Sequence, residues 1–398
     1  MIALNNLNIE ATCPICAALL RATGWYMPGM RILARAQCAG CRRDFFVDLP
    51  AGQGLHSPMI LDRATGAVHD RVGVAWFADW LRISFRERTG TTTALTIDRR
   101  LPITRTAVLI NCLDTLYGHA LLKLFSVQQY LDAGEFDVIL IVQPFLASLV
   151  PKGVAETWLV DLPLPDGIRW SDSLAEAIAT QSARIEDLRL APVHPHPHAS
   201  IVSIERFSSV PPFATNQWHA EGTKKVTFIW RDDRIWSPAG WLAPRGQVKA
   251  VAAFFVALRR EQPHLDAAVA GLGTSGGLPD WIADKRFARP SENVERDWLR
   301  LYADSHAVIG VHGSNMILPS AHAGSVFELL PDSRQGNFLQ DILFNGTDPR
   351  DLLFRYRFVP DDIAPARLAR LVAFVLARYP DFDRLMSFDA GHDRDVRA

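Results

Sequence analysis

The stretch VIGVHGSNMILPSAHAGSVFELLP, residues 308–331, places a short polar segment between two apolar runs. The runs at either end are short and bounded by turn-forming residues, which is typical of buried strands. The middle of the stretch begins with His312 and Gly313 and continues with helical spacing. A strand, a helix and another strand form the repeating unit of a parallel sheet that helices cover on both faces. The stretch therefore predicts an α/β fold.

The same alternation extends through the C-terminal half of the chain. Apolar strands are predicted at 224–230 and 266–273, and amphipathic helices at 246–263, 292–305 and 364–379. The spacing of these segments predicts one parallel sheet that includes residues 308–331.

A second block with the same pattern lies upstream, with strands predicted at 106–111, 136–142 and 156–163 and helices at 118–134 and 170–190. Between the blocks, residues 191–222 are rich in proline and lack periodicity, which is typical of a boundary. The HPHPH segment at 194–198 belongs to this linker, because polyproline II geometry points alternate histidines apart. Two such blocks predict two Rossmann-like domains that face each other across a cleft.

Four cysteines form two C-x2-C pairs, Cys13 with Cys16 and Cys38 with Cys41, whereas Cys112 stands alone. Two such pairs can supply four thiolates to one tetrahedral zinc ion. A site with four protein ligands is closed, so this zinc would support the fold and not take part in chemistry. The alternative is two reducible disulfides or a chance pairing.

Domain ranges follow from these patterns. Short strands at 31–37 and 44–49 accompany the cysteine pairs, and residues 56–70 are typical of a loop-rich linker. A chain of 398 residues is too long for one ordinary domain. The predicted domains are a zinc ribbon at 1–50, an N-terminal Rossmann-like domain at 51–215, and a C-terminal Rossmann-like domain with a terminal helix at 216–398.

The composition limits which classes of partner and which cellular location we expect. The formal net charge of −1 and the pI near 6.9 give no broad attraction for nucleic acid or for an acidic membrane. Apolar runs long enough to span a membrane are absent, and the N-terminus lacks the basic-then-apolar pattern of a signal peptide. We expect a cytoplasmic protein with no nucleic-acid partner and at most peripheral membrane contact.

Ligands of open parallel sheets bind beyond the carboxyl ends of the strands. His312 and Gly313 occupy such a position, and Ser314 and Asn315 fall where the N-cap of the next helix is expected. Free N–H groups at a helix start suit a phosphate or pyrophosphate. The alternative is an ordinary capped helix between two strands.

Arg231 and Arg234 follow the strand predicted at 224–230. Guanidinium groups at a strand end can neutralise a phosphate. Alternatively, the two arginines pair with Asp232 and Asp233 at the surface. The nearby segment GLGTSGG, 271–277, contains G-x-G-x-x-G, but no long helix follows, so we interpret it as a flexible loop and not as a dinucleotide site.

In the upstream block, Asp114 and His119 follow the strand at 106–111. Either could act as a base that deprotonates an acceptor hydroxyl. The alternative is a structural histidine at a helix start. Lys123, one turn further along, could instead contact phosphate.

Three segments together resemble the family-61 glycosyltransferases. YADSHAVIGVHGSNMILPSAHAGSVFELLP, 302–331, is similar to the family's AD…vGvHGAGLtn…lPP…v.El.P signature. VTFIWRDDR, 226–234, is similar to a strand that ends in an Arg-rich segment, and YGHALLKLFSVQQYL, 117–131, is similar to an fgHwl.e.lprl helix. The order of the three segments and the distances between them along the chain agree with the family between about residues 107 and 331. The resemblance does not include the cysteine module.

The resemblance implies the GT-B fold and transfer of a sugar from a nucleotide-sugar donor to a hydroxyl acceptor, with inversion and without a catalytic metal. It places His312, Gly313, Ser314 and Asn315 near the donor diphosphate and implies that Arg231 and Arg234 neutralise it. It implies that Glu328 accepts hydrogen bonds from the donor ribose and that His119 is the acceptor-side base.

The sequence departs from the family where HGSN replaces HGAG, so that Asn315 stands at a glycine position. The absence of a luminal signal or anchor favours bacterial polysaccharide assembly, with a glycan or lipid-linked acceptor. The alternatives are a non-catalytic scaffold, built from a zinc ribbon and a degenerate transferase fold, and a zinc-ribbon nucleic-acid binder, which the net charge disfavours.

Overall fold

The computed structural model describes residues 1–88, 92–194, 202–220, 222–236, 245–343 and 349–386. The chain forms two compact units, Met1–Ser208 and Ser209–Ala398, which are described separately. The ranges 1–50, 51–215 and 216–398 stay predictions. Of the HPHPH segment, His196 and His198 lie outside the described residues.

Residues 20–70 of the first unit form an antiparallel sheet whose strands follow one another in chain order. Its strands are β2 (Leu20–Tyr26), β3 (Leu33–Cys38), β4 (Asp44–Asp48), β5 (Met59–Asp62) and β6 (Val68–Asp70). The strands predicted at 31–37 and 44–49 are confirmed. The linker predicted at 56–70 is wrong, because these residues form the hairpin β5–β6.

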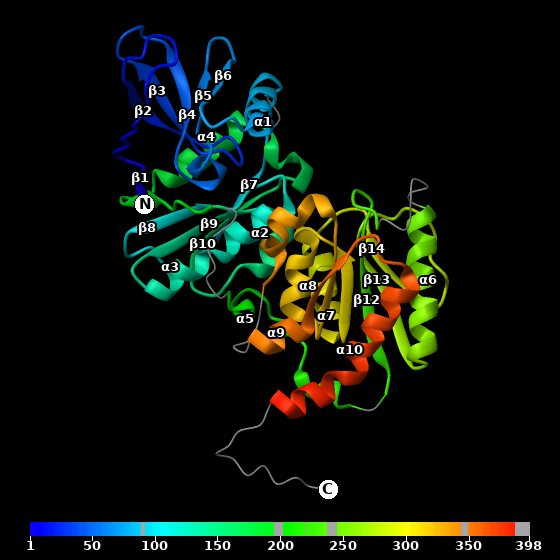
Figure 1. Ribbon diagram of the computed structural model, residues 1–398. Helices are drawn as coiled ribbons and strands as arrows, with labels where there is room; N and C mark the ends of the chain where they lie inside the picture. Colours follow the sequence, from blue (N-terminus) through cyan, green and yellow to red (C-terminus); the bar gives the residue numbers. More distant parts are fainter. Residues whose placement is uncertain (89–91, 195–201, 221, 237–244, 344–348, 387–398) are drawn as a thin grey trace. The chain divides into compact units, whose positions relative to one another are not determined.

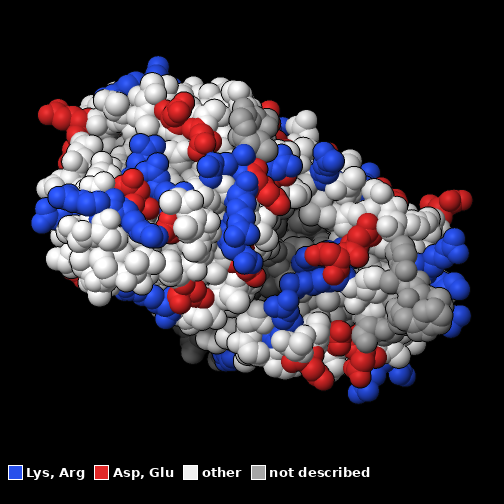
Figure 2. All heavy atoms as spheres, turned by 90° about the horizontal axis from the view of Figure 1, so that it is seen from above, with Lys and Arg blue, Asp and Glu red and all other residues white. Residues whose placement is uncertain are grey.

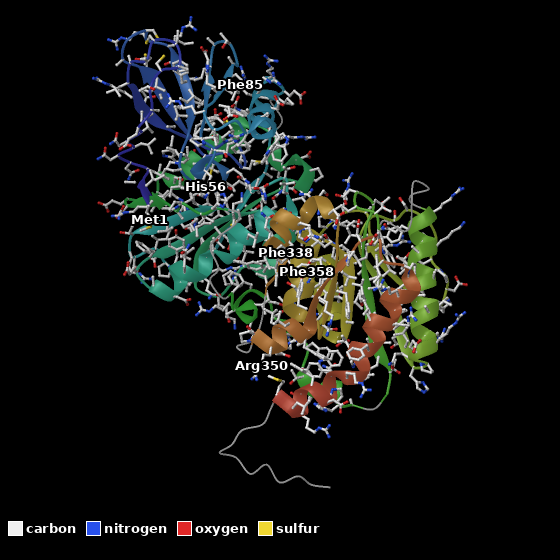
Figure 3. All side chains as sticks on the ribbon, viewed as in Figure 1. Met1, His56, Phe85, Phe338, Arg350 and Phe358 are labelled. Carbon is white, nitrogen blue, oxygen red and sulfur yellow. The ribbon has the colours of Figure 1, made fainter. Side chains whose placement is uncertain are left out.

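A tight turn forms this hairpin. The Asp62 carboxylate accepts the backbone N–H groups of Ala64 and Thr65, and Gly66 has a φ of +70°. Helix α1 (Ala75–Arg86) then packs Phe77, Leu81 and Phe85 against the sheet, and Figure 3 labels Phe85.

The larger sheet of the first unit has the order β1-β11-β8-β9-β10-β7. Its parallel strands are β8 (Ala107–Asn111), β9 (Asp137–Val142), β10 (Val154–Val160) and β11 (Leu188–Leu190). Antiparallel strands β1 (Ile2–Ala3) and β7 (Leu95–Arg99) form its edges. The helices of this unit are α2 (Tyr117–Phe125), α3 (Val127–Ala133), α4 (Asp172–Ser182) and α5 (Ile204–Phe207).

Two predicted helices of this unit differ from the structure. The helix at 118–134 divides at Ser126, whose hydroxyl bonds back to the Leu122 carbonyl, and it ends at Gly134 in the left-handed conformation as expected. The helix at 170–190 ends at Ser182, and its last residues form β11. Pairing with β8 decides the conformation of these last residues.

The second unit contains an all-parallel sheet with the order β14-β13-β12-β15-β16-β17. Its strands are β12 (Lys224–Arg231), β13 (Leu265–Leu272), β14 (Ala283–Phe287), β15 (Ala307–Val311), β16 (Val326–Leu330) and β17 (Tyr356–Pro360). The helices are α6 (Arg245–Glu261), α7 (Glu292–Asp304), α8 (Ile317–His322), α9 (Pro349–Arg355) and α10 (Pro365–Met386). Helices α6 and α10 share one hydrophobic core with the sheet, and Figure 1 shows α7 and α8 on its other face.

The predicted fold class is confirmed: each unit contains a Rossmann-like parallel sheet covered by helices, and a small cysteine-bearing sheet precedes the first. Strands β8, β9, β15 and β16 are buried along their whole length. On the face shown in Figure 2, basic and acidic side chains are interspersed. Among the described residues, none of the helices combines the length and hydropathy needed to cross a bilayer.

The packing of α6 against its sheet lets us predict how much a cavity there lowers the free energy of unfolding. Phe254 on α6 is fully buried, so we expect Phe254→Ala to lower the free energy of unfolding by about 3–5 kcal/mol. Val256 on the same helix is 43% exposed, and Val256→Ala should cost no more than about 0.5 kcal/mol. Urea unfolding measures both, and equal costs would contradict this packing.

Candidate functional site

The predicted site residues of the second unit lie at the carboxyl ends of two neighbouring strands. Strand β12 ends at Arg231, and β15 ends at Val311, directly before His312. The two strands are parallel and hydrogen-bonded to each other, so Arg231 and His312 lie at the same edge of the sheet. Open parallel sheets bind ligands at this edge.

Gly313 lies beneath two guanidinium groups. Its φ of +146° is in a region that glycine favours, and a Cβ there would lie 2.4 Å from Arg234 Nη1 and 2.8 Å from Arg231 Nη1. Glycine therefore permits both arginines to approach the backbone at this point.

Each arginine is held by a specific acceptor. Arg234 Nη1 donates to the His312 carbonyl at 2.5 Å, and Arg231 Nη1 donates to Asn315 Oδ1 at 3.0 Å. Arg231 Nε also donates to the Asp233 carboxylate at 2.7 Å. Burial raises the pKa of Asp233, but the hydrogen bond and charge of Arg231 outweigh it and lower the pKa. The expected pairing with Asp233 is present, and Arg231 still contacts the turn.

Asn315 contributes a side-chain donor that no described residue accepts. Its Oδ1 is occupied by Arg231, which orients the amide, and its Nδ2 is buried with no hydrogen-bond partner among the described residues. A buried amide N–H without an acceptor is costly in free energy. The cluster formed by Gly313, Asn315, Arg231 and Arg234 is called the arginine cradle below, and all of its side-chain donors suit an anion.

The helix that follows differs from the expectation. Residues Ser314–Met316 form a 3-10 turn, and α8 has only six residues. Neither Ser314 nor Asn315 caps a helix with its side chain, so their assignment as N-caps is wrong. Asn315 instead accepts a hydrogen bond from Arg231. The positive charge that the helix start was expected to provide comes here from the arginine side chains.

A buried chain of polar groups lies behind the cradle. His312 Nδ1 lies 2.5 Å from Glu328 Oε1, and the Tyr356 hydroxyl donates to Glu328 Oε2. His312 is 1% exposed and Glu328 0% exposed. The Tyr356 ring packs near Phe358, which contacts Phe338 (Figure 3). The expectation that Glu328 accepts ribose hydroxyls is not supported here, because both of its oxygens are engaged inside the protein.

In the first unit, Asp114 lies in the short loop that leads from the carboxyl end of β8 to α2. Asp114 Oδ2 is 2.9 Å from Lys123 Nζ, and its Oδ1 accepts the Leu116 N–H and lies 3.7 Å from His119 Nδ1. Burial raises the pKa of Asp114, but the charge of Lys123, with smaller contributions from His119, lowers it well below its usual range. Lys123 also donates to the Leu113 carbonyl at 2.5 Å. The alternative of a phosphate contact by Lys123 is therefore wrong, because its ammonium group is buried in internal bonds.

His119 is the accessible member of this cluster. Its side chain is 13% exposed, against 1% for Asp114. Its Nδ1 also lies 3.3 Å from the amide nitrogen of Gln53, which belongs to the 3-10 turn Gly52–Leu55 that precedes β5. Asp114 and Gln53 both lie at Nδ1 of the imidazole, and His119, unlike the buried Asp114, can meet a solvent-borne hydroxyl.

The glycine-rich segment 271–277 behaves as a loop. It leads from β13 directly into the neighbouring strand β14, with no helix in this fully described stretch. A Cβ on Gly273 would meet the Asp232 carboxylate at 2.2 Å, and Arg286 donates to the carbonyls of Ser275 and Gly276. A dinucleotide fingerprint requires a helix at this point, so the interpretation as a loop agrees with the structure.

The four cysteines of the C-x2-C pairs come together. Their sulfur atoms lie within 4.8 Å of one another, with Cys13 to Cys41 at 3.7 Å and Cys16 to Cys38 at 3.4 Å. These distances are close to the roughly 3.8 Å between the sulfurs of a zinc tetrahedron and far from a disulfide bond of about 2.05 Å. The cluster could hold a metal ion.

The two knuckles have matching local geometry. Ala17 and Arg42, each directly after the second cysteine of its pair, share a φ of +61°. In each knuckle this residue donates its N–H to the carbonyl of the first cysteine. Cys112 is buried elsewhere, and burial raises the pKa of its thiol to about 12.

Sequence reasoning missed two residues at these sites. Tyr356 begins the unpredicted strand β17, and Gln53 lies near the misassigned segment 56–70. No spacing rule links these residues to His312 or His119, because the contacts depend on tertiary structure.

Comparison with known proteins gives weak similarities only. No protein-family model and no curated protein matches the chain. The structure of E. coli ADP-heptose lps heptosyltransferase II is 11% identical with a TM-score of 0.40, covering 70% of this chain and 100% of that one. A family 9 glycosyl transferase from Veillonella parvula DSM 2008 is 6% identical with a TM-score of 0.42, covering 69% and 98%. These values are too low to assign this chain an activity.

The cysteine geometry predicts one zinc ion per chain. We expect protein purified from zinc-supplemented medium to contain about one equivalent of zinc by elemental analysis, and Cys38→Ser to lose it. Cys112→Ser, a matched change at a buried cysteine outside the cluster, should retain the metal. Retention of zinc in Cys38→Ser would contradict the four-thiolate site.

The Asp114–Lys123 pair predicts a pH-dependent loss of stability. Asp114→Asn leaves the Lys123 charge buried without its partner, so at pH 7 we expect a cost of roughly 3–5 kcal/mol. Because the folded-state pKa of Asp114 lies below the unfolded value of about 3.9, its contribution is present above that pH and declines as the pH falls from about 5.

Urea unfolding of wild type and Asp114→Asn across this range measures the difference. The gap between them should narrow at acid pH, and Asp114→Asn combined with Lys123→Met should recover stability at pH 7. A gap that does not change with pH would show that the carboxylate charge is not the stabilising feature.

Proposed function

We propose that the chain is a glycosyltransferase that moves a sugar from a nucleoside-diphosphate donor to a hydroxyl acceptor. The observation that supports this most directly is the arginine cradle at the carboxyl edge of the second sheet. Two guanidinium groups converge on Gly313, and the Asn315 amide nitrogen beside them has no acceptor among the residues that the structure describes. These donors suit the diphosphate of such a sugar donor.

The chemistry of sugar transfer needs positive charge at this place. When the glycosidic bond to the diphosphate breaks, the leaving oxygen gains negative charge. Arg231 and Arg234 can stabilise that charge more strongly in the transition state than in the ground state. Arg234 binds the His312 carbonyl, Glu328 holds the His312 ring, and Tyr356 in turn holds Glu328, so His312, Glu328 and Tyr356 act as positioning residues for the turn.

On the acceptor side, His119 is the proposed base. To accept a proton at Nε2, its imidazole must carry a proton on Nδ1, which lies 3.7 Å from the acceptor Asp114 Oδ1. In this tautomer Gln53 must present its amide oxygen to Nδ1 in place of the nitrogen that lies 3.3 Å away. Asp114 is buried and paired with Lys123, so it would orient and stabilise the imidazolium and not contact the acceptor. Inversion at the anomeric carbon without a catalytic metal remains part of this proposal.

The resemblance to family 61 supports the same assignment through HGSN at 312–315, WRDDR at 230–234 and YGH at 117–119. Asn315, the departure from that family, adds a side-chain donor to the cradle. We propose a cytoplasmic enzyme of bacterial glycan assembly with a glycan or lipid-linked acceptor. Zinc in the cysteine cluster would stabilise the small sheet around β2–β4 and not take part in transfer.

The proposal predicts thermal stabilisation by nucleoside diphosphates. At a concentration about 100-fold above the dissociation constant, a ligand of the native state adds about 2.7 kcal/mol, a shift of several degrees in Tm. We expect at least one of UDP, GDP, ADP and CDP to produce this shift. Arg234→Gln should abolish it, and so should Gly313→Ala, because its Cβ would displace both guanidinium groups.

The matched control is Arg296→Gln on α7, an arginine that pairs with Glu292 at the surface. It should retain the full shift. No shift with any nucleotide or nucleotide sugar would refute the donor site and favour the non-catalytic scaffold.

A further inference from the structure

Helices α6 and α10 lie side by side on the same face of the second sheet (Figure 1). Each buries one side in the common core, with Phe254 and Leu258 from α6 and Val372 and Leu376 from α10. Because both helices bury one side against the same sheet, their opposite sides both face away from that sheet. These two outward sides form one surface of the unit.

The outward side of α6 is basic and apolar. It presents Arg245, Lys249, Val256 and Arg260, whose spacing aligns them along one stripe of the helix opposite the buried residues. The one acidic residue of this helix is Glu261 at its last position.

The outward side of α10 has the same character. It presents Arg367, Arg370, Leu371, Phe374 and Arg378 on one stripe. The first acidic residue of the helix is Asp381, which pairs with Arg378 and Arg384 at its C-terminal end. The stripes of α6 and α10 together are called the α6–α10 surface.

The cations of this surface are poorly neutralised. Within the described ranges, no carboxylate forms an ion pair with the arginines or lysine at 245, 249, 260, 367 and 370. On α7, by contrast, Arg296 pairs with Glu292 and Arg300 with Asp297. The α6–α10 surface therefore keeps a positive charge in a chain whose net charge is −1.

Apolar side chains stand among these cations. Phe374 is 56% exposed, Val256 43% and Leu371 39%. We propose that the α6–α10 surface docks on an anionic lipid bilayer. Its arginines and lysine would attract acidic headgroups, while Phe374, Leu371 and Val256 would enter the boundary between headgroups and acyl chains. A phosphate backbone would match the charges and leave these apolar groups unused, so the apolar residues favour lipid over nucleic acid.

Vesicle co-sedimentation of the full chain tests the proposal. We expect binding to phosphatidylcholine vesicles that contain phosphatidylglycerol, little binding to pure phosphatidylcholine, and weaker binding at high salt. Arg367→Glu with Arg370→Glu should weaken binding by about tenfold or more, because two attractive charges become repulsive. Phe374→Ser should weaken it without changing its salt dependence. Arg245→Glu with Lys249→Glu, the same change of charge on α6, should also weaken binding.

The matched control is Arg296→Glu with Arg300→Glu, the same change of charge on α7. It should bind vesicles as wild type does. Far-UV circular dichroism and any nucleotide-induced thermal shift should be unchanged in all variants, which separates this proposal from the donor site. Equal binding to both kinds of vesicle, no binding to either, loss in the α7 control, or a preference for duplex DNA over anionic vesicles would each overturn it.

Discussion

The buried contact between Glu328 and His312 is the interaction on which the arrangement of the second unit's site depends. A carboxylate with no exposed surface loses its hydration, and such a loss is tolerated only when hydrogen bonds replace water. His312 and Tyr356 supply those bonds from the neighbouring strand end and from β17. One carboxylate thereby connects three adjacent strands behind the turn that begins with Gly313.

Fixing the imidazole also fixes the backbone of this turn. The His312 carbonyl accepts Arg234, and Gly313 follows it with space for both guanidinium groups. The arginines are thus placed by backbone geometry and by their own acceptors before any ligand arrives. Such preorganisation is what electrostatic stabilisation of a leaving diphosphate requires. In the first unit, Asp114 has a similar organising position, with Lys123 as its buried partner and His119 at its accessible side.

The sequence was sufficient where a single local pattern determines the structure. Continuous apolar runs predict the central strands, since these are buried on both faces, and the C-x2-C spacing predicts the convergence of four sulfurs. The sequence was insufficient to predict the secondary structure of segments whose conformation depends on pairing with distant strands. Strand β14 gives no strand signal because it is largely exposed and polar. The segment at 56–70 resembles a loop because a tight turn divides it into two short strands. Residues 188–190 continue a helical pattern, yet they pair with β8 as a strand. His119 and Arg231 were predicted as site residues, whereas Gln53 and Tyr356 were not. Tyr356 lies 28 residues from its partner Glu328, in a strand without a clear sequence signal.

A crystal structure with a bound nucleoside diphosphate would test the central claim most directly. The account predicts that the diphosphate lies over Gly313, accepts hydrogen bonds from Arg231 and Arg234, and supplies the missing acceptor for Asn315 Nδ2, while Glu328 stays bonded to His312 and Tyr356. A nucleotide bound elsewhere, with both guanidinium groups still on Asn315, Asp233 and the His312 carbonyl, would contradict it.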